Sequence, residues 1–261
     1  MMHPDRWPRY GVALYTLVHK EVSRFMRIWT QTLVPSIITM ALYFAIFGKL
    51  IGTRIGVMDG QPYINYIIPG LIMMSVITNT YMNTVFSFFS SKFQRNIEEL
   101  LVAPMPSLII IWGYLIGGTL RGVVVGILIY LVAFCFTEVP IQNIGMTWLV
   151  AILTSLLFSL AGLFNGIFAR GFDDINIVPT FVLTPLTYLG GVFYSIQLLP
   201  PFWQKVTHFN PIFYMVNAFR YGISGVTDVS IGIALSVIIS LIVIFYCLVW
   251  YYFEKRSDGL V

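Results

Sequence analysis

The chain has 261 residues, of which 58% are hydrophobic and 10% are charged, whereas soluble domains carry about 25% charged residues. A soluble fold of this size could not bury so much apolar surface, so the composition predicts an all-α, polytopic membrane protein. The formal net charge of +4 is typical of the basic cytoplasmic loops of such proteins, and we expect no nucleic-acid partner.

Residues 1–29 are predicted to form a cytoplasmic tail and an interfacial helix. Between residues 10 and 28, apolar side chains fall on one helical face, and Lys20, Arg24 and Arg27 fall on another. This pattern is typical of a helix that lies in the membrane surface and contacts membrane lipids. A soluble N-terminal helix is the alternative.

Residues 30–253 are predicted to form one transmembrane domain with six spans. Each span is an apolar run that approaches or exceeds about 20 residues, the length that crosses a bilayer. The third run contains Arg121, so an alternative is that its first part lies at the interface. Residues 254–261 follow as a cytoplasmic tail. The predicted spans are 30–50, 64–89, 108–136, 146–168, 175–193 and 231–253.

The basic residues outside these spans predict the orientation of the chain. Because cytoplasmic loops carry more Lys and Arg, the side with more of them is predicted to be cytoplasmic, and both termini lie on it. The other side has four: Lys49, Arg54, Lys205 and Arg220. The cytoplasmic side has ten: Arg6, Arg9, Lys20, Arg24, Arg27, Lys92, Arg95, Arg170, Lys255 and Arg256.

Two connections are predicted to be structured. The cytoplasmic connection at 92–106 has the pattern of an amphipathic helix from Lys92 to Ala103, and prolines end it. The external connection at 194–230 is too apolar for a solvated loop. Its prolines and the break at Asn210 divide it into two short helices, predicted to form a re-entrant hairpin in the outer leaflet.

The chain lacks the residue patterns of common catalytic and metal sites. Its three histidines have no metal-ligand spacing, and no GxxxxGK[ST] phosphate loop is present, so any ATPase must be a separate chain. No carboxylate lies near the middle of a predicted span, which disfavours ion coupling. We expect no catalytic residue, no metal and no cofactor on this chain.

Three stretches resemble the ABC-2 type transporter permeases: QRNIEELLVAPMP at 94–106, FDDI at 172–175 and VPTFVLTPLTYLGGVFYSIQLLPPFW at 178–203. The resemblance covers essentially the whole chain. It implies an exporter in the bacterial inner membrane, built from two permease chains and two separate cassette ATPase subunits that hold ATP and Mg²⁺. It does not imply a particular exported substrate.

The cytoplasmic helix is then the expected docking element for the ATPase. Apolar side chains on one face would enter a groove or rest on the permease, and charged side chains would set the orientation. An interfacial helix resting on lipid head groups is the alternative. The expected coupling residues are Phe93, Arg95, Ile97, Glu98, Glu99 and Leu101.

The second span carries a polar stripe, because Ser75, Asn79, Asn83 and Ser87 recur every four residues. We expect this stripe, with Arg121, to line a translocation path. Hydrogen bonds between helices are the alternative for the stripe. For Arg121 the interpretations are contact with an anionic substrate, binding of a lipid phosphate and snorkelling to the cytoplasmic interface. Glycines of the third and fourth spans predict close helix packing: Gly118, Gly122, Gly126, Gly162 and Gly166.

Aromatic side chains of the external connection are candidates for an outer gate, and interfacial anchoring is the alternative. They are Phe202, Trp203, Phe209 and Phe213. The predicted function is a homodimeric permease that exports an amphipathic or hydrophobic compound. A carrier or channel that works without ATP is the second hypothesis, and an intramembrane enzyme acting on lipid intermediates is the third.

Overall fold

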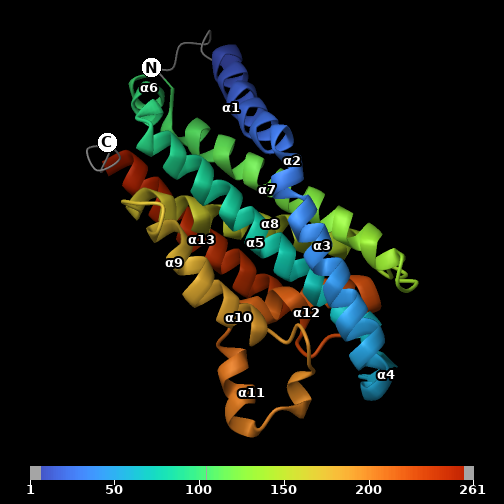
Figure 1. Ribbon diagram of the computed structural model, residues 1–261. Helices are drawn as coiled ribbons and strands as arrows, with labels where there is room; N and C mark the ends of the chain where they lie inside the picture. The colour runs from blue at the N-terminus through green and yellow to red at the C-terminus, as the bar shows by residue number, and fades with distance from the viewer. Residues whose placement is uncertain (1–6, 104, 256–261) are drawn as a thin grey trace.

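The computed structural model describes residues 7–103 and 105–255, and this part of the chain forms a helical bundle with one small hairpin (Figure 1). In chain order the elements are α1 (Trp7–Arg27), α2 (Trp29–Thr32), α3 (Val34–Tyr43), the π-helix η2 (Phe44–Ile51), α4 (Gly52–Ile55), β1 (Val57–Met58), β2 (Gln61–Pro62), α5 (Tyr63–Phe93), α6 (Asn96–Val102), α7 (Ser107–Phe134), α8 (Ile144–Phe168), α9 (Asp174–Val178), the π-helix η3 (Pro179–Leu183), α10 (Thr184–Tyr188), the 3-10 helix η4 (Ile196–Leu198), α11 (Pro201–His208), α12 (Pro211–Ser224) and α13 (Ile231–Lys255).

The centre of the bundle is α5, which packs along α7 and α8 (Figure 1). Glycines allow these helices to approach closely. A Cβ atom at Gly162 of α8 would lie 2.6 Å from the carbonyl oxygen of Tyr81, and one at Gly118 of α7 would meet the hydroxyl groups of Thr84 and Ser159. The close packing predicted from the glycine spacing is therefore confirmed.

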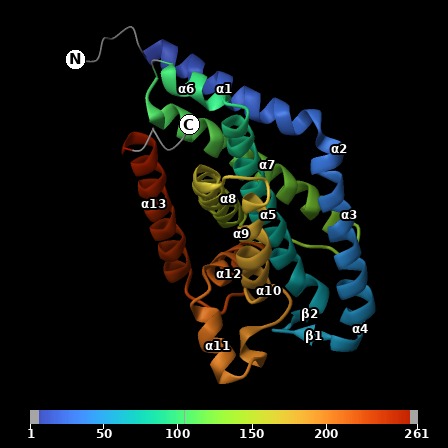
Figure 2. The ribbon, with the colours of Figure 1, turned by 60° about the vertical axis from the view of Figure 1, so that its left-hand side comes forward.

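The N-terminal helix α1 lies across α7 (Figure 2). Leu17 and Glu21 of α1 contact the backbone of α7 at Gly113 and Gly117, where any larger side chain would clash with them. Helix α1 begins and ends within three residues of its predicted bounds. It is joined directly to the first predicted span.

Four helical segments of the described chain are long and apolar enough to cross a membrane: Trp29–Ile55, Ser107–Phe134, Ile144–Phe168 and Ile231–Glu254. They correspond to the first, third, fourth and sixth predicted spans. The third predicted span is one unbroken helix, α7. Helix α5 is longer, at 31 residues, but its asparagine, serine and threonine side chains make it less apolar. Its crossing of the membrane stays a prediction.

The fifth predicted span, 175–193, differs most from the structure. Its helix comprises α9, η3 and α10 and ends at Tyr188, so residues 189–193 lie outside it. Pro179 and Pro185 each lack an amide donor, and the backbone responds with the wider turn of η3. The Thr184 hydroxyl donates a hydrogen bond of 2.9 Å to the carbonyl oxygen of Pro179. Because this helix is short, its crossing also stays a prediction.

The connection predicted to be external, at 194–230, forms two helices, α11 and α12, as predicted, and the break falls at Asn210. The Asn210 side chain caps α12 by accepting a hydrogen bond from the amide of Ile212 at 3.0 Å. Helix α12 packs against α5, α8 and α13, whereas α11 projects from the end of the bundle (Figure 1).

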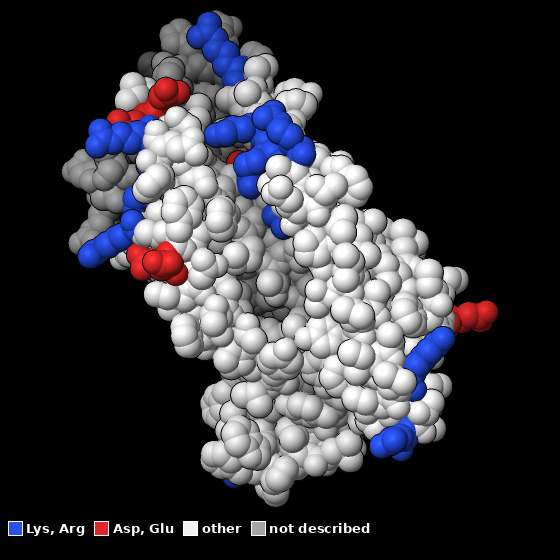
Figure 3. All heavy atoms as spheres, viewed as in Figure 1, with Lys and Arg blue, Asp and Glu red and all other residues white. Residues whose placement is uncertain are grey.

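Charged side chains gather at one end of the molecule (Figure 3). Lys and Arg cluster at the end that carries α1 and α6, few charges mark the opposite end, and the band between them is uncharged on this face. Arg220, which the sequence places among the loop charges on the external side, is only 2% exposed. It donates to the carbonyl oxygen of Gly191 and stacks over the Tyr66 ring, so it stabilises packing instead.

We expect residues 94 and 205 to lie on opposite sides of the membrane. Gln94 and Lys205 are both exposed, so each should react when replaced by cysteine in a chain whose native Cys135 and Cys247 are serine. A membrane-impermeant maleimide should label Lys205→Cys in intact cells and Gln94→Cys only in inverted vesicles. Labelling of both positions from the same side would contradict the predicted orientation.

Candidate functional site

One side of α5 is left uncovered by its neighbours. The α3 segment lies to one side of it and α9–α10 to the other (Figure 1), and Figure 3 shows a hollow along this face with basic side chains at its upper end. Along this face of α5, the side chains that are not buried recur every four residues. Thr78 and Phe86 are exposed, and Met82 is half-buried. We refer to this hollow as the α5 groove, and we infer from their exposure and their shared helix face that these three residues form its floor.

The predicted polar stripe lies beside the floor of the α5 groove, and most of it belongs to one hydrogen-bonded cluster. Arg121 of α7 donates to the side-chain oxygens of Asn79 at 3.2 Å and Asn83 at 3.3 Å. Ser36 of α3 joins the network through Asn79 at 3.1 Å. Ser75 is buried and its hydroxyl has no hydrogen-bond partner within the described residues.

Helix α1 contributes a carboxylate and a guanidinium to the same cluster. Glu21 accepts a hydrogen bond of 2.6 Å from the Ser87 hydroxyl and one of 3.0 Å from Arg24. Arg24 also donates to the Asn83 side-chain oxygen at 2.9 Å. We name the group formed by Glu21, Arg24, Asn79, Asn83, Ser87 and Arg121 the polar cluster.

Sequence reasoning missed the two α1 residues. No role is predicted for Glu21 from the sequence, yet it is only 2% exposed. A signal was present, because Glu21 lies four residues from both Leu17 and Phe25 and so shares the buried face of the helix. The snorkelling alternative for Arg121 is wrong, because this side chain is buried and bonded to two asparagines.

The helix predicted from Lys92 to Ala103 is shorter in the structure. Helix α5 continues to Phe93, the chain turns at Arg95, whose φ is 60°, and α6 begins at Asn96. Phe93 therefore does not share a helix with Ile97. Its ring packs against Phe172, with centroids 5.3 Å apart. A left-handed residue ends α5 and redirects the chain, which periodicity alone does not predict.

The remaining coupling residues divide between the two faces of α6. Ile97 is 1% exposed and fixes α6 to the bundle, while Glu99 is exposed and Glu98 partly so. Arg95 is exposed and lies 4.0 Å from the Glu98 carboxylate. The side chain of Leu101 lies outside the described part of the chain.

Beside α6 is a polar cleft of about 600 Å³. Phe89, Lys92, Arg95, Glu98 and Arg170 are among the residues that line it. The Lys92 ammonium group donates to the carbonyl oxygen of Ile167 at 2.7 Å and so caps the end of α8.

The four predicted gate residues occupy different environments. Phe202, Trp203 and Phe209 are exposed, with Phe209 at 89%, whereas Phe213 is fully buried. In the nearby loop before α13, burial raises the pKa of Asp228, and the neighbouring Arg220 opposes that shift.

A different aromatic contact joins the first and fifth helical segments. The hydroxyl groups of Tyr43 and Tyr188 lie 3.4 Å apart, and Phe193 stacks on Tyr188 with centroids 5.8 Å apart. Phe47 lies 5.1 Å from Phe193. We name these four residues the aromatic bridge. It crosses the α5 groove near the end of the bundle that carries the connection at 194–230.

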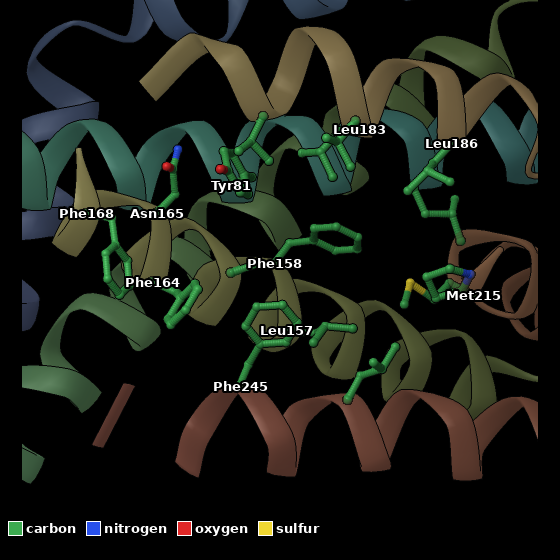
Figure 4. A pocket seen from close by; sticks show the side chains of 16 residues that line it. Tyr81, Leu157, Phe158, Phe164, Asn165, Phe168, Leu183, Leu186, Met215 and Phe245 are labelled. Atoms are coloured by element: carbon green, nitrogen blue, oxygen red, sulfur yellow. The ribbon is translucent and has the colours of Figure 1, made fainter. Parts of the chain in front are cut away.

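A second hollow lies on the other side of α9–α10, between these helices and α13. It encloses about 480 Å³ and is lined almost entirely by apolar side chains (Figure 4). Tyr81 and Asn165 are its polar residues and lie near one end, close to Phe168 (Figure 4). Such a surface suits a hydrocarbon chain and offers few groups for recognising a polar one.

The model of the family described as "ABC-2 type transporter" matches residues 12–224, which include α5, α6, the polar cluster and the aromatic bridge. The chain belongs to the ABC-2 type transporter family. It is similar to the inner membrane transport permease YadH of Escherichia coli K12, with 57% identity over 251 residues, 96% of this chain and 98% of YadH. YadH of Shigella flexneri matches equally.

A more distant relative is nodulation protein J of Sinorhizobium fredii, with 23% identity over 224 residues, 82% of this chain and 85% of that protein. The family predicted from the three sequence stretches is therefore confirmed, and the chain is a membrane transport permease.

Proposed function

We propose that the permease forms half of the translocation path of an ATP-driven exporter in the bacterial inner membrane. Two copies would face each other across their α5 grooves, and two separate cassette ATPases would bind at the end that carries α6. The observation that carries this proposal is the uncovered side of α5. In lipid, a partly exposed charged side chain such as Arg24 must face protein or water, and a second copy would enclose the groove beside it.

Helix α6 and the polar cleft beside it are the proposed ATPase contact. Ile97 holds α6 against the bundle, so force applied to α6 would pass to α5 through the short turn at Arg95. Arg95, Glu98 and Glu99 present charge outward for a partner of matching pattern. The family supports this assignment, because its members work with an ATPase subunit.

We expect transport to need ATP and not an ion gradient. Among the described residues, the carboxylate that we assign to the proposed path is Glu21, which is already bonded to Arg24 and Ser87. In inverted vesicles that hold the permease and its ATPase, ATP-dependent uptake of a fluorescent amphiphile should persist after protonophore and sodium ionophore collapse the gradients. Uptake that stops under these conditions, or that proceeds without ATP, would favour the carrier hypothesis.

We propose that the aromatic bridge, more than the exposed aromatics in and directly after α11, closes the groove on its outer side. Replacing both Tyr43 and Tyr188 with alanine should remove the contact between the two segments and open the groove. The readout is labelling of Thr78→Cys, an exposed floor position, by an impermeant maleimide added outside.

The comparison variant replaces Phe202 and Phe209 with alanine. It should leave Thr78→Cys as protected as in the parent chain, because both side chains point into solvent or lipid. If this variant admits the reagent and the double tyrosine variant does not, the outer gate lies in α11.

A further inference from the structure

The polar cluster has more positive charge than negative charge. Arg24 and Arg121 both donate to the same Asn83 oxygen, at 2.9 and 3.3 Å, so their guanidinium groups lie close together. Among the described residues Glu21 is the carboxylate that contacts the cluster, and its ion pair is with Arg24. Two like charges so near each other repel, and burial strengthens that repulsion.

The cluster also has more hydrogen-bond donors than acceptors. The Nε atoms of Arg24 and Arg121 and the amide nitrogen of Asn83 are buried and have no hydrogen-bond partner within the described residues. Arg121 is only 9% exposed and Asn83 is fully buried. Buried donors normally find acceptors. A negatively charged group with several acceptor oxygens would therefore balance the positive charge of the cluster and accept hydrogen bonds from its unpaired donors.

The cluster is accessible from the α5 groove. The Arg24 side chain is 30% exposed, and Figure 3 shows basic side chains at the upper end of the hollow. From there the floor of the groove continues past Phe86 and Met82, which are apolar. A charged head group at the cluster would therefore leave its chain lying against apolar side chains.

We infer that the polar cluster binds the anionic head group of an amphiphile whose hydrocarbon chain lies along the α5 groove. Arg121 and Arg24 contribute the charge, Asn83 contributes an amide donor, and Glu21 limits the surplus to one positive charge. This inference rests on the proposed function, since it names the class of compound that the path takes: a single- or double-chain phosphate or carboxylate. An exported compound and a membrane lipid share this chemistry.

The test measures binding of radiolabelled dodecyl phosphate to the full-length permease in phosphatidylcholine nanodiscs, with empty nanodiscs subtracted. Arg121→Gln should weaken binding about tenfold or more, because a charge-assisted contact is lost. Arg121→Lys should retain most of the affinity. Arg27→Gln is the matched control, because Arg27 is an exposed basic residue one turn from Arg24, and its affinity should stay within about twofold of the parent.

The Glu21→Gln variant distinguishes a binding site that depends on charge from a network that only stabilises the fold. It keeps an oxygen that can accept from Ser87 but removes the negative charge, so it should tighten binding several-fold. A purely structural network predicts that Glu21→Gln and Arg121→Gln both reduce thermal stability and both weaken binding. That result, or equal affinities for Arg121→Gln and Arg27→Gln, would overturn the inference. The Glu21→Gln arm also decides the matter if Arg121→Gln does not fold.

Competition identifies the source of the head group. Excess inorganic phosphate should displace the probe poorly, because it lacks the chain, and dodecyl phosphocholine should compete weakly, because its net charge is zero. Anionic phosphatidylglycerol in the nanodisc should compete if lipid is an occupant, and no competition would assign the site to another amphiphile. Displacement by inorganic phosphate as effective as by dodecyl phosphate would contradict an amphiphile site. The ATPase is absent from this assay, so its result is independent of whether α6 docks that subunit.

Discussion

Reversing Glu98 and Glu99 to lysine should detach the ATPase from the permease. Both residues lie on α6, Glu98 partly exposed and Glu99 exposed, while Ile97 holds the helix to the bundle from another face. If basic groups of the ATPase pair with these carboxylates, the reversal replaces attraction with repulsion. Losing such pairs costs about 2–5 kcal/mol, which corresponds to about thirtyfold or more in affinity. The measurement is co-purification of the ATPase with the double variant.

Glu254→Lys is the control for this experiment. Glu254 is an exposed acidic residue at the end of α13, on the end of the bundle that also carries α6 (Figure 1). It should retain the ATPase. If α6 instead rests on lipid head groups, the double reversal should strengthen attachment to anionic lipid and leave the ATPase bound. An ATPase that stays bound and coupled would remove the acidic pair from the docking surface.

Replacing Gly162 with alanine should destabilise the bundle more than the addition of one methyl group would suggest. The added Cβ atom would lie 2.6 Å from the carbonyl oxygen of Tyr81 and 3.3 Å from the amide nitrogen of Val85. Both contacts are with backbone, so the conflict can be relieved only by separating α8 from α5. Overpacking of this kind costs about 1–3 kcal/mol, and it should appear as a lower unfolding temperature of the permease in detergent.

The matched variant is Gly232→Ala, in the first turn of α13. A Cβ atom there would meet no atom within 4 Å apart from the adjacent backbone of its own helix, so stability should be unchanged or slightly raised, as alanine favours the helix. Equal unfolding temperatures for the two variants would mean that α5 and α8 can separate at little cost.

The sequence predicts the elements of this protein better than their contacts. Apolar runs and proline positions are local properties, and they place the long helices and the two helices of the external connection near their observed bounds. The fifth span is too long in the prediction because apolar residues continue past Tyr188 into a loop that packs on α12 through Phe213. Burial in protein and burial in lipid give the same hydrophobic signal.

The sequence does not predict the contacts within the polar cluster. The spacing of Asn79, Asn83 and Ser87 indicates a stripe on α5, but their partners lie far along the chain: Glu21 is 66 residues from Ser87. Glu21 and Arg24 lie on one helix that periodicity assigns to the membrane surface. Their position against α7 depends on Gly113 and Gly117, which leave room for α1.

The sequence by itself determined the all-α class, the long apolar helices, the polar stripe and the ABC-2 family, because each follows from local composition, periodicity or a continuous motif. The tertiary structure decided that α6 begins only after Arg95, that Glu21 joins two arginines, and that Tyr43 meets Tyr188 across 145 residues of chain. These features depend on which helix faces meet and on the position of each helix along the axis of its neighbour. That choice is made by close packing over the whole bundle, and no single segment encodes it.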